Sequence, residues 1–369
     1  MRRAAYNHLY QLRLPADNGA NYIWNPYNMP NKPKKPSLEH LGRLTDDTGL
    51  LQHAKFIILD RANGYCTDDN ARAVIVMTKY YKQYPGPEAL RLFEIYLAFL
   101  YHALKPDKTV YNFMDYDRNW KQDKPAGDAL GRSVWAFGAV ISSPPDPAYV
   151  PVVREFFNDT SKHIPEMSLR GMAYSMLGLA ECLQQFPDAK ETKQLLSFAA
   201  DSLVKLYKKN SAADWNWFED VLSYDNAILP AALFVAAVVL NEKKYLTVAE
   251  KTCKFLLENT YNGRHFSFIG SNGWYPKGKQ RAQFNQQPIE VASTVLMLKA
   301  ACKATKNAEY LKLQRKAFDW FSGENDLRIP VYDVKTKGCC DGMGDGGVNI
   351  NQGAESIVSF LLAALYMQK

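Results

Sequence analysis

The sequence predicts an all-α fold, an (α/α)6 toroid in which six helical hairpins close into a ring. The first observation is that a short polar or acidic cluster runs six times into an apolar, small-residue segment, at residues 68, 128, 168, 223, 286 and 351. These starts lie 60, 40, 55, 63 and 65 residues apart. The spacing is too uneven for a solenoid, and it is typical of a degenerate repeat with one helical hairpin per unit.

The second observation is an alternation of two kinds of helical segment. Segments with one charged face are expected near 38–53, 88–104, 147–161, 190–209, 243–260 and 307–322. Each precedes a segment rich in Ala, Gly and Val, near 69–83, 128–141, 168–183, 224–240, 287–303 and 351–367. The charged face indicates outer helices with one side in water, and the apolar segments indicate inner helices buried on most sides.

The third observation is the length of the connections. Connections from an inner to an outer helix are short, whereas 54–68, 105–127, 210–223, 261–286 and 323–350, which lead to inner helices, are mostly long. Long ordered loops in a compact domain are usually functional, and these would all lie on one rim, at the N-termini of the inner helices. Residues 266–274 are expected to form a short β-hairpin there, with its turn at Asn272-Gly273.

Composition supports one soluble domain. Residues 1–36 are polar and are expected to form an extended N-terminal arm, and residues 37–369 a single toroid domain. The net charge of +7 is concentrated in the arm, which leaves a nearly neutral body and argues against nucleic-acid binding. No apolar run is long enough to span a membrane. The N-terminus has no apolar signal region, which favours a cytoplasmic location with reduced cysteines.

Carboxylates at the inner-helix starts are the candidate catalytic groups. Asp68 and Asp69 open an inner helix, whose positive end favours ionised carboxylates, although one of the two could instead be a helix cap. Glu219 and Asp220 follow two Trp and a Phe, and an apolar setting of this kind raises the pKa of a carboxyl and suits a proton donor. Asp128 opens the second inner helix and competes as a partner.

Several polar and aromatic residues near the same rim are candidate sugar ligands. Sugar rings stack on aromatic faces, and amides bond hydroxyl groups; the candidates are Arg72, Arg132, Trp217, Tyr224, Asn226, Trp274, Gln287 and Asn351. For Arg72, Arg132, Arg170, Glu290 and Glu355, ion pairs between helices are the competing structural interpretation. Asp341 is expected to cap the glycine-rich turn that follows it.

Residues 38–369 resemble the six-hairpin glycosidase superfamily. The stretches Gly64–Arg72 and Gly347–Ser356 resemble those of uncharacterised bacterial proteins that are often encoded with, or fused to, glycosyltransferases. Tandem aspartates also resemble the catalytic pair of endo-α-1,6-mannanases, although that family surrounds its pair with a different motif. Unsaturated glucuronyl hydrolases place two aspartates about as far apart as Asp69 and Asp128. Sugar 2-epimerases on similar toroids use inner-helix histidines, which are missing from the predicted inner helices here.

These observations favour a carbohydrate-active protein, and within that class a glycoside hydrolase acting on an oligosaccharide or polysaccharide. Glu219 would donate the proton, Asp68 or Asp69 would act as base or nucleophile, and Asp128 or Asp220 would support them. The alternative is a non-catalytic glycan-binding or glycosyltransferase-accessory module. A polysaccharide lyase, with Tyr224 as base and Arg132 beside it, is a third possibility. No cofactor or metal is expected, and a functional link to a glycosyltransferase is expected from the resemblance.

Overall fold

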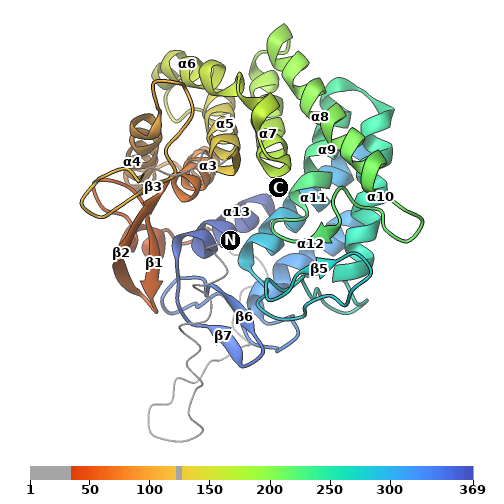
Figure 1. The fold of residues 1–369 in the computed structure, drawn as a ribbon. Coiled ribbons are helices and arrows are strands. Elements are labelled where there is room, and N and C mark those ends of the chain that lie inside the picture. Colours follow the sequence, from red (N-terminus) through yellow and green to blue (C-terminus); the bar gives the residue numbers. More distant parts are fainter. Residues whose placement is uncertain (1–34, 122–126, 369) are drawn as a thin grey trace, which may run out of the picture.

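The computed structural model describes residues 35–121 and 127–368 and contains the predicted toroid. Six inner helices neighbour one another in sequence order, and the last returns to contact the first (Figure 1). They are α3 (Thr67–Gln83), α5 (Gly127–Ser142), α7 (Leu169–Gln185), α9 (Ile228–Leu240), α11 (Pro288–Thr305) and α13 (Ala354–Tyr366). All six inner helices were therefore predicted close to their observed bounds. Most of the predicted arm, residues 1–34, lies outside the described residues.

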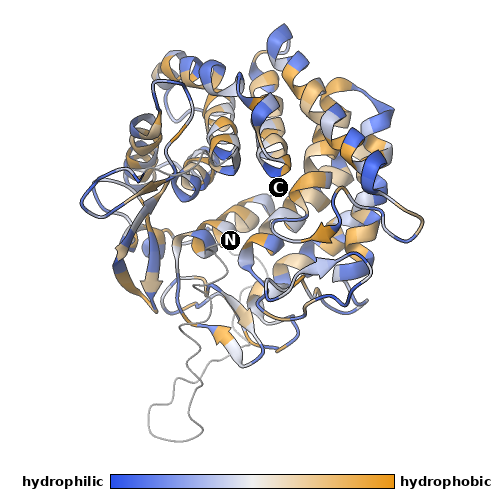
Figure 2. Ribbon diagram, viewed as in Figure 1, coloured by the Kyte–Doolittle hydropathy of each residue, from blue (hydrophilic) through white to orange (hydrophobic). Residues whose placement is uncertain are grey.

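Outer helices pack around this ring. They are α2 (Glu39–Arg43), α4 (Pro87–Ala103), α6 (Val150–Ser161), α8 (Lys190–Asn210), α10 (Lys243–Thr260) and α12 (Glu309–Asp319), with short 3₁₀ turns η1 (Pro147–Tyr149), η2 (Ile164–Glu166) and η3 (Trp320–Ser322). The inner helices are coloured mainly as apolar, whereas the outer helices carry polar residues along one side (Figure 2). The apolar core therefore lies within and around the inner ring, as the two kinds of segment predicted.

Close packing of α5 and α7 helps to bring the rim residues of these two helices together. A Cβ atom at Gly138 would lie 2.2 Å from the carbonyl oxygen of Gly178, and one at Gly131 would lie 2.2 Å from that of Gly171. Such distances leave no room for a side chain, so the two helices touch backbone to backbone. Arg132 and Tyr174, one on each helix, consequently meet at the same end of the ring.

Short strands occupy the long connections that lead to the inner helices. β1 (Leu51–Lys55) and β2 (Ile58–Cys66) form an antiparallel hairpin, and β3 (Phe113–Met114) pairs with the end of β2. β4 (Val221–Leu222) pairs with β5 (Tyr275–Pro276), and β6 (Gly342–Gly344) forms a hairpin with β7 (Gly347–Asn349). The β2–β3 and β4–β5 pairings tie successive connections to one another on the predicted rim (Figure 1).

Two local predictions are wrong. The first outer helix, predicted over 38–53, ends at Arg43, because the Asp46 carboxylate accepts hydrogen bonds from the backbone N–H groups of Thr48 and Gly49 and forms a turn before β1. The hairpin predicted at 266–274 forms its turn at residues 271–273, where the Trp274 N–H donates to the Gly270 carbonyl at 3.0 Å, but residues 266–270 form no strand and the chain after the turn forms β5, which pairs with β4. Across the described ranges, none of the helices combines the length and the apolar character that a membrane span needs.

Candidate functional site

Arg72 is the centre of a buried ion-pair network at the inner-helix starts. Its guanidinium lies 2.8 Å from Asp68 and 3.3 Å from Asp69 on the same helix, and 2.8 Å from Glu355 on α13. Burial alone would lower the pKa of Arg72, but Asp68, Tyr224 and Glu355 raise it well above its usual value. The ring closure between α3 and α13 therefore brings together acids that lie almost 290 residues apart in the sequence.

Both aspartates lie in the first turn of α3, and neither occupies its N-cap position. The N-cap position is Cys66, which makes no side-chain capping bond, and the helix is instead entered directly from β2. The capping alternative is therefore wrong for both residues. Their carboxylates point to arginines, and the positive end of the helix adds to the stabilisation of the negative charge.

Arg132, which lies on α5, joins α7 and the segment before α9 to the same network. Its guanidinium lies 2.6 Å from Asp68 and 3.3 Å from Asp225, and it donates a hydrogen bond to the Tyr174 hydroxyl at 2.5 Å. Tyr174 in turn donates to Asp225 at 2.5 Å. Because Arg132 is almost fully buried and engaged by these groups, its first role is to hold the network together.

Tyr224 and Glu355 form the more accessible part of the cluster. The Tyr224 hydroxyl lies 2.6 Å from the Arg72 guanidinium and donates to Glu355 at 2.9 Å. Burial raises the pKa of Tyr224 well above its usual value; Arg72 opposes the shift and Glu355 adds to it. The Glu355 side chain is 29% exposed, whereas those of Asp68 and Asp69 are 4% and 10% exposed. Glu355 is thus the carboxylate of this group that a ligand reaches most easily.

A second ion pair lies between α7 and the loop before α9. The Arg170 guanidinium lies 3.0 Å from Glu219 and also donates to the Ser223 hydroxyl at 3.1 Å. Asp128 accepts a short hydrogen bond from the hydroxyl of Ser168, the N-cap of α7. Glu219 and Asp128 are therefore near the predicted rim, but each is bonded to groups other than the Arg72 network.

Two acids near the inner-helix starts, the half-buried Asp341 and the buried Glu290, carry raised pKa values. Burial, with Glu355 adding and His53 opposing, raises the pKa of Asp341 to about 6. Its Oδ1 atom accepts hydrogen bonds from the Gly353 N–H at 2.7 Å and the Ser356 hydroxyl at 2.9 Å, so Asp341 stabilises the start of α13 rather than the glycine-rich turn. Burial and Asp225 raise the pKa of Glu290 to about 8; its carboxyl accepts from the backbone N–H groups of Asp225 and Asn226.

Three predicted residues lie where they cannot take the expected roles in this structure. Trp217 is fully buried and packs against Phe218 and Phe255, so its ring offers no face to a sugar. Asn226 is also fully buried, and its side chain bonds Ser223 and Glu290. The Asp220 side chain is 77% exposed and lies 4.0 Å from Lys277, with no contact to the Arg72 network.

Three other predicted ligands remain partly accessible. Trp274, Gln287 and Asn351 are half-buried, and the Asn351 side chain accepts a hydrogen bond from the Phe56 N–H at 2.9 Å.

The sequence did not predict Glu355 or Asp341 as site residues. Glu355 had a usable signal, since it opens an inner helix in the same way as Asp69, but the environment of Asp341 depends on contacts between distant loops.

Asp68, Asp69 and Glu355 also meet the spacing of a metal site, because they offer carboxylate oxygens within 4.8 Å of one another. However, the Arg72 guanidinium contacts all three and supplies the positive charge that a cation would otherwise provide. The arrangement therefore fits an arginine-centred network better than a metal centre.

No protein-family model and no curated protein sequence matches the chain. Solved structures do resemble it. The cellobiose 2-epimerase of Bacillus thermoamylovorans B4167 gives a TM-score of 0.70 at 12% identity, covering 90% of this chain and 95% of that one. A D-mannose isomerase gives 0.69 at 9% identity, covering 89% and 95%, and an α-mannanase of Bacteroides thetaiotaomicron, of glycoside hydrolase family 76, gives 0.62 at 11%, covering 89% and 93%. At these identities the likeness shows a shared fold, the (α/α)6 toroid.

Proposed function

We propose that the chain is a glycoside hydrolase that cleaves its substrate at the rim formed by the N-termini of the inner helices. The names of the similar structures include an epimerase, an isomerase, a mannanase and a cellulase, all of them enzymes of sugars. The observation that carries the proposal is the setting of Asp341 and Glu355. The Asp341 carboxyl has a raised pKa, and the Glu355 carboxylate pairs with Arg72. Both carboxyl groups lie at the start of α13.

Asp341 is the proton donor in this proposal. Glycoside hydrolysis needs a carboxyl that still holds its proton near neutral pH, and a pKa of about 6 meets that need. Because Oδ1 accepts two hydrogen bonds, the proton would lie on Oδ2. Glu219, the donor predicted from sequence, is a weaker candidate, since protonation would break its ion pair with Arg170.

Glu355 is the ionised partner, with Asp69 beside it. The Arg72 guanidinium and the Tyr224 hydroxyl both contact Glu355 Oε2, and these contacts favour the charged form of Glu355. Asp68 is held by two arginines and is almost fully buried, so it stabilises the arrangement instead of touching substrate. Asp128, Trp274, Gln287 and Asn351 remain candidate contacts to the sugar. The expected link to a glycosyltransferase stays a prediction.

The test is a screen for reducing-sugar release from gluco- and manno-oligosaccharides, followed by variants on whichever substrate is cleaved. Asp341→Asn and Glu355→Gln should each lower kcat by about 10²–10⁴-fold, which is the usual contribution of a general acid or base. Asp220→Asn is the matched control, since its side chain is exposed and outside the network, and it should keep the wild-type rate. Wild-type rates in both Asp341→Asn and Glu355→Gln would reject the assignment.

The same screen separates the alternatives. Calorimetric binding of an oligosaccharide without any turnover would support a glycan-binding module instead. A new sugar isomer without cleavage would point to epimerase chemistry, for which the inner helices supply no histidine. We do not propose a lyase, because the raised pKa of Tyr224 makes its phenol a poor base.

A further inference from the structure

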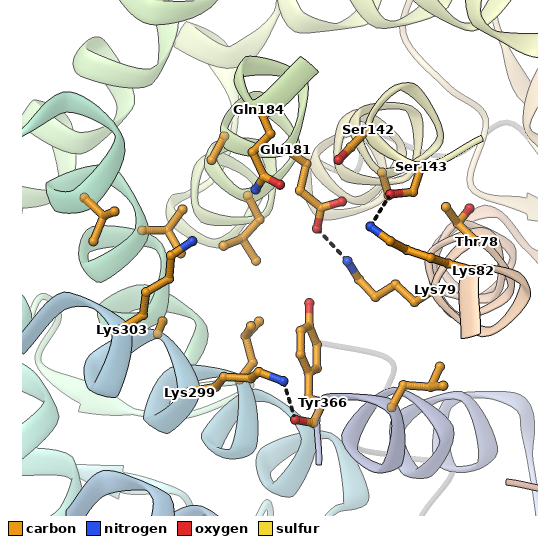
Figure 3. A pocket seen from close by; sticks show the side chains of 18 of the residues that line it. Thr78, Lys79, Lys82, Ser142, Ser143, Glu181, Gln184, Lys299, Lys303 and Tyr366 are labelled. Carbon is orange, nitrogen blue, oxygen red and sulfur yellow. Dashed lines mark hydrogen bonds and ion pairs between the residues drawn. The ribbon is translucent and has the colours of Figure 1, made fainter. Parts of the chain in front are cut away.

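A cavity lies at the end of the ring opposite the Arg72 network, among the C-terminal halves of the inner helices. It has a volume of about 330 Å³, and every one of the six inner helices contributes to its lining. Figure 3 shows its polar part, which includes Thr78, Lys79, Lys82, Glu181, Lys299 and Lys303. The volume is within the range of pockets that take small molecules. The Arg72 network lies at the opposite helix ends, so this cavity is separate from the proposed hydrolytic site.

The lining carries an excess of positive charge. Four lysines and one glutamate are its charged residues, which gives a surplus of three positive charges. The single acid, Glu181, is already engaged: Lys79 lies 2.8 Å from its carboxylate, and the Trp135 indole N–H donates to it at 3.2 Å. Among the described residues, Lys82 donates only to the Ser143 hydroxyl, at 3.1 Å, and Lys303 has no ion pair or hydrogen bond. The ammonium groups of Lys82 and Lys303 therefore retain donors for a ligand.

The cavity also brings like charges together. The ammonium groups of Lys79 and Lys299 lie 5.5 Å and 5.9 Å from the centre of the same Tyr366 ring (Figure 3). Burial and the charge of Lys79 lower the pKa of Lys299. An anion in the cavity would relieve this repulsion and accept hydrogen bonds from the lysine ammonium groups.

The rest of the lining is apolar. Phe234, Val235 and Val239 of α9 and Leu296 and Ala300 of α11 face the same space. Leu296 precedes the end of α11 by nine residues, or about two and a half turns, so the cavity extends well inside the ring. We propose that it binds a small organic phosphate, with the phosphate among the lysines and the organic group against this apolar wall.

Neutralisation of the helix dipoles is the competing explanation for the lysines. Helix C-termini carry partial negative charge, and Lys299 does donate to the carbonyl oxygens of Tyr366 and Gln368. That role also suits Lys82 and Lys303, which lie in the last turns of α3 and α11, but it explains neither the cavity that these lysines line nor its apolar wall. A surplus of three charges also suits a phosphate, which carries almost two negative charges, better than a carboxylate with one.

Isothermal titration calorimetry of the full chain with phenyl phosphate tests the proposal. We expect binding of one equivalent, tighter than that of inorganic phosphate, which lacks the apolar group, and tighter than that of benzoate, which carries less charge. Lys82→Gln combined with Lys303→Gln should weaken phenyl phosphate binding about tenfold or more, because charge-assisted hydrogen bonds are lost. Lys205→Gln combined with Lys251→Gln is the matched control, since both lysines are exposed on outer helices and should leave binding unchanged.

The outcomes separate this proposal from the hydrolytic one. Absence of phenyl phosphate binding, or equal weakening in both double variants, would overturn it, and equal affinity for benzoate would overturn the assignment to phosphate. Val238→Glu offers an independent check, because the exposed Val238 lines the cavity and a carboxylate there should repel the ligand without disturbing the core. Asp341→Asn should leave phenyl phosphate binding unchanged, because Asp341 lies at the opposite end of the ring from the cavity. The binding result therefore does not depend on whether the hydrolytic proposal holds.

Discussion

Replacing Arg72 by Met should destabilise the protein strongly and make its stability depend on pH in a new way. The guanidinium is 4% exposed and is the shared partner of Asp68, Asp69 and Glu355. Breaking a buried ion pair by removing one partner typically costs about 3–5 kcal/mol, because the remaining charge stays buried without compensation. For a chain of 369 residues, an unfolding entropy of about 2.1 cal/mol/K per residue converts this to a fall in Tm of about 4–6 °C.

The pH dependence distinguishes lost charge compensation from lost packing. Without Arg72, the clustered carboxylates should take up protons at higher pH in the folded state than in the unfolded state. The folded state then binds more protons, so the stability of Arg72→Met should fall as pH rises from about 5 to 8, relative to the wild type. At the low end of this window the carboxylates are protonated and much of the loss should be recovered.

Chemical denaturation at pH 5 and pH 8 measures both effects. Arg91→Met is the matched control, since Arg91 pairs with Glu88 on the surface, with both side chains about half exposed, and the loss of such a pair costs within about 1 kcal/mol. A difference between Arg72→Met and wild type that is equal at both pH values would refute the electrostatic explanation. A loss no larger than that of Arg91→Met would refute the central role of Arg72.

Three further predictions concern the fold and the buried groups. Gly138→Ala should cost about 1–3 kcal/mol in denaturation experiments, because the new methyl group would force α5 away from Gly178, whereas Gly346→Ala, with open space around it, should be nearly neutral. Because the pKa of Glu290 is raised to about 8, the folded wild type keeps a proton that the unfolded chain releases, and its stability should fall as pH rises from about 4.5 to 8. Glu290→Gln should flatten this fall. An unchanged dependence of stability on pH would contradict the prediction. Trp217→Phe should lower stability but leave the affinity for any sugar substrate unchanged, because the ring is fully buried, and a large rise in KM at intact stability would show the opposite.

The fold was predictable because each inner helix is recognised by its own sequence. A small-residue, apolar segment after a polar opening is a local pattern, and six repeats of it fix the number of hairpins without any knowledge of their contacts. The exception was 38–53, where Leu38, Leu41 and Leu44 keep a helical spacing but Asp46 ends it. A side chain that bonds nearby backbone N–H groups competes with the helix, and hydrophobic periodicity does not register that competition.

The candidate site was predictable only as far as local rules apply. The first turn of an inner helix favours acids wherever it occurs, and this placed Asp68 and Asp69 at the rim before any contact was known. The choice of proton donor depended instead on which groups arrive from elsewhere in the chain. Glu219 was expected to be desolvated by neighbouring aromatic residues, but those rings turn into the core and Arg170, from the preceding hairpin, pairs with the carboxylate. Asp341 has no aromatic neighbours in sequence, yet burial against the start of α13 raises its pKa to about 6. In a closed ring of helices, the protonation of a rim acid is therefore set by the adjoining hairpins, and sequence neighbours are a poor guide to it.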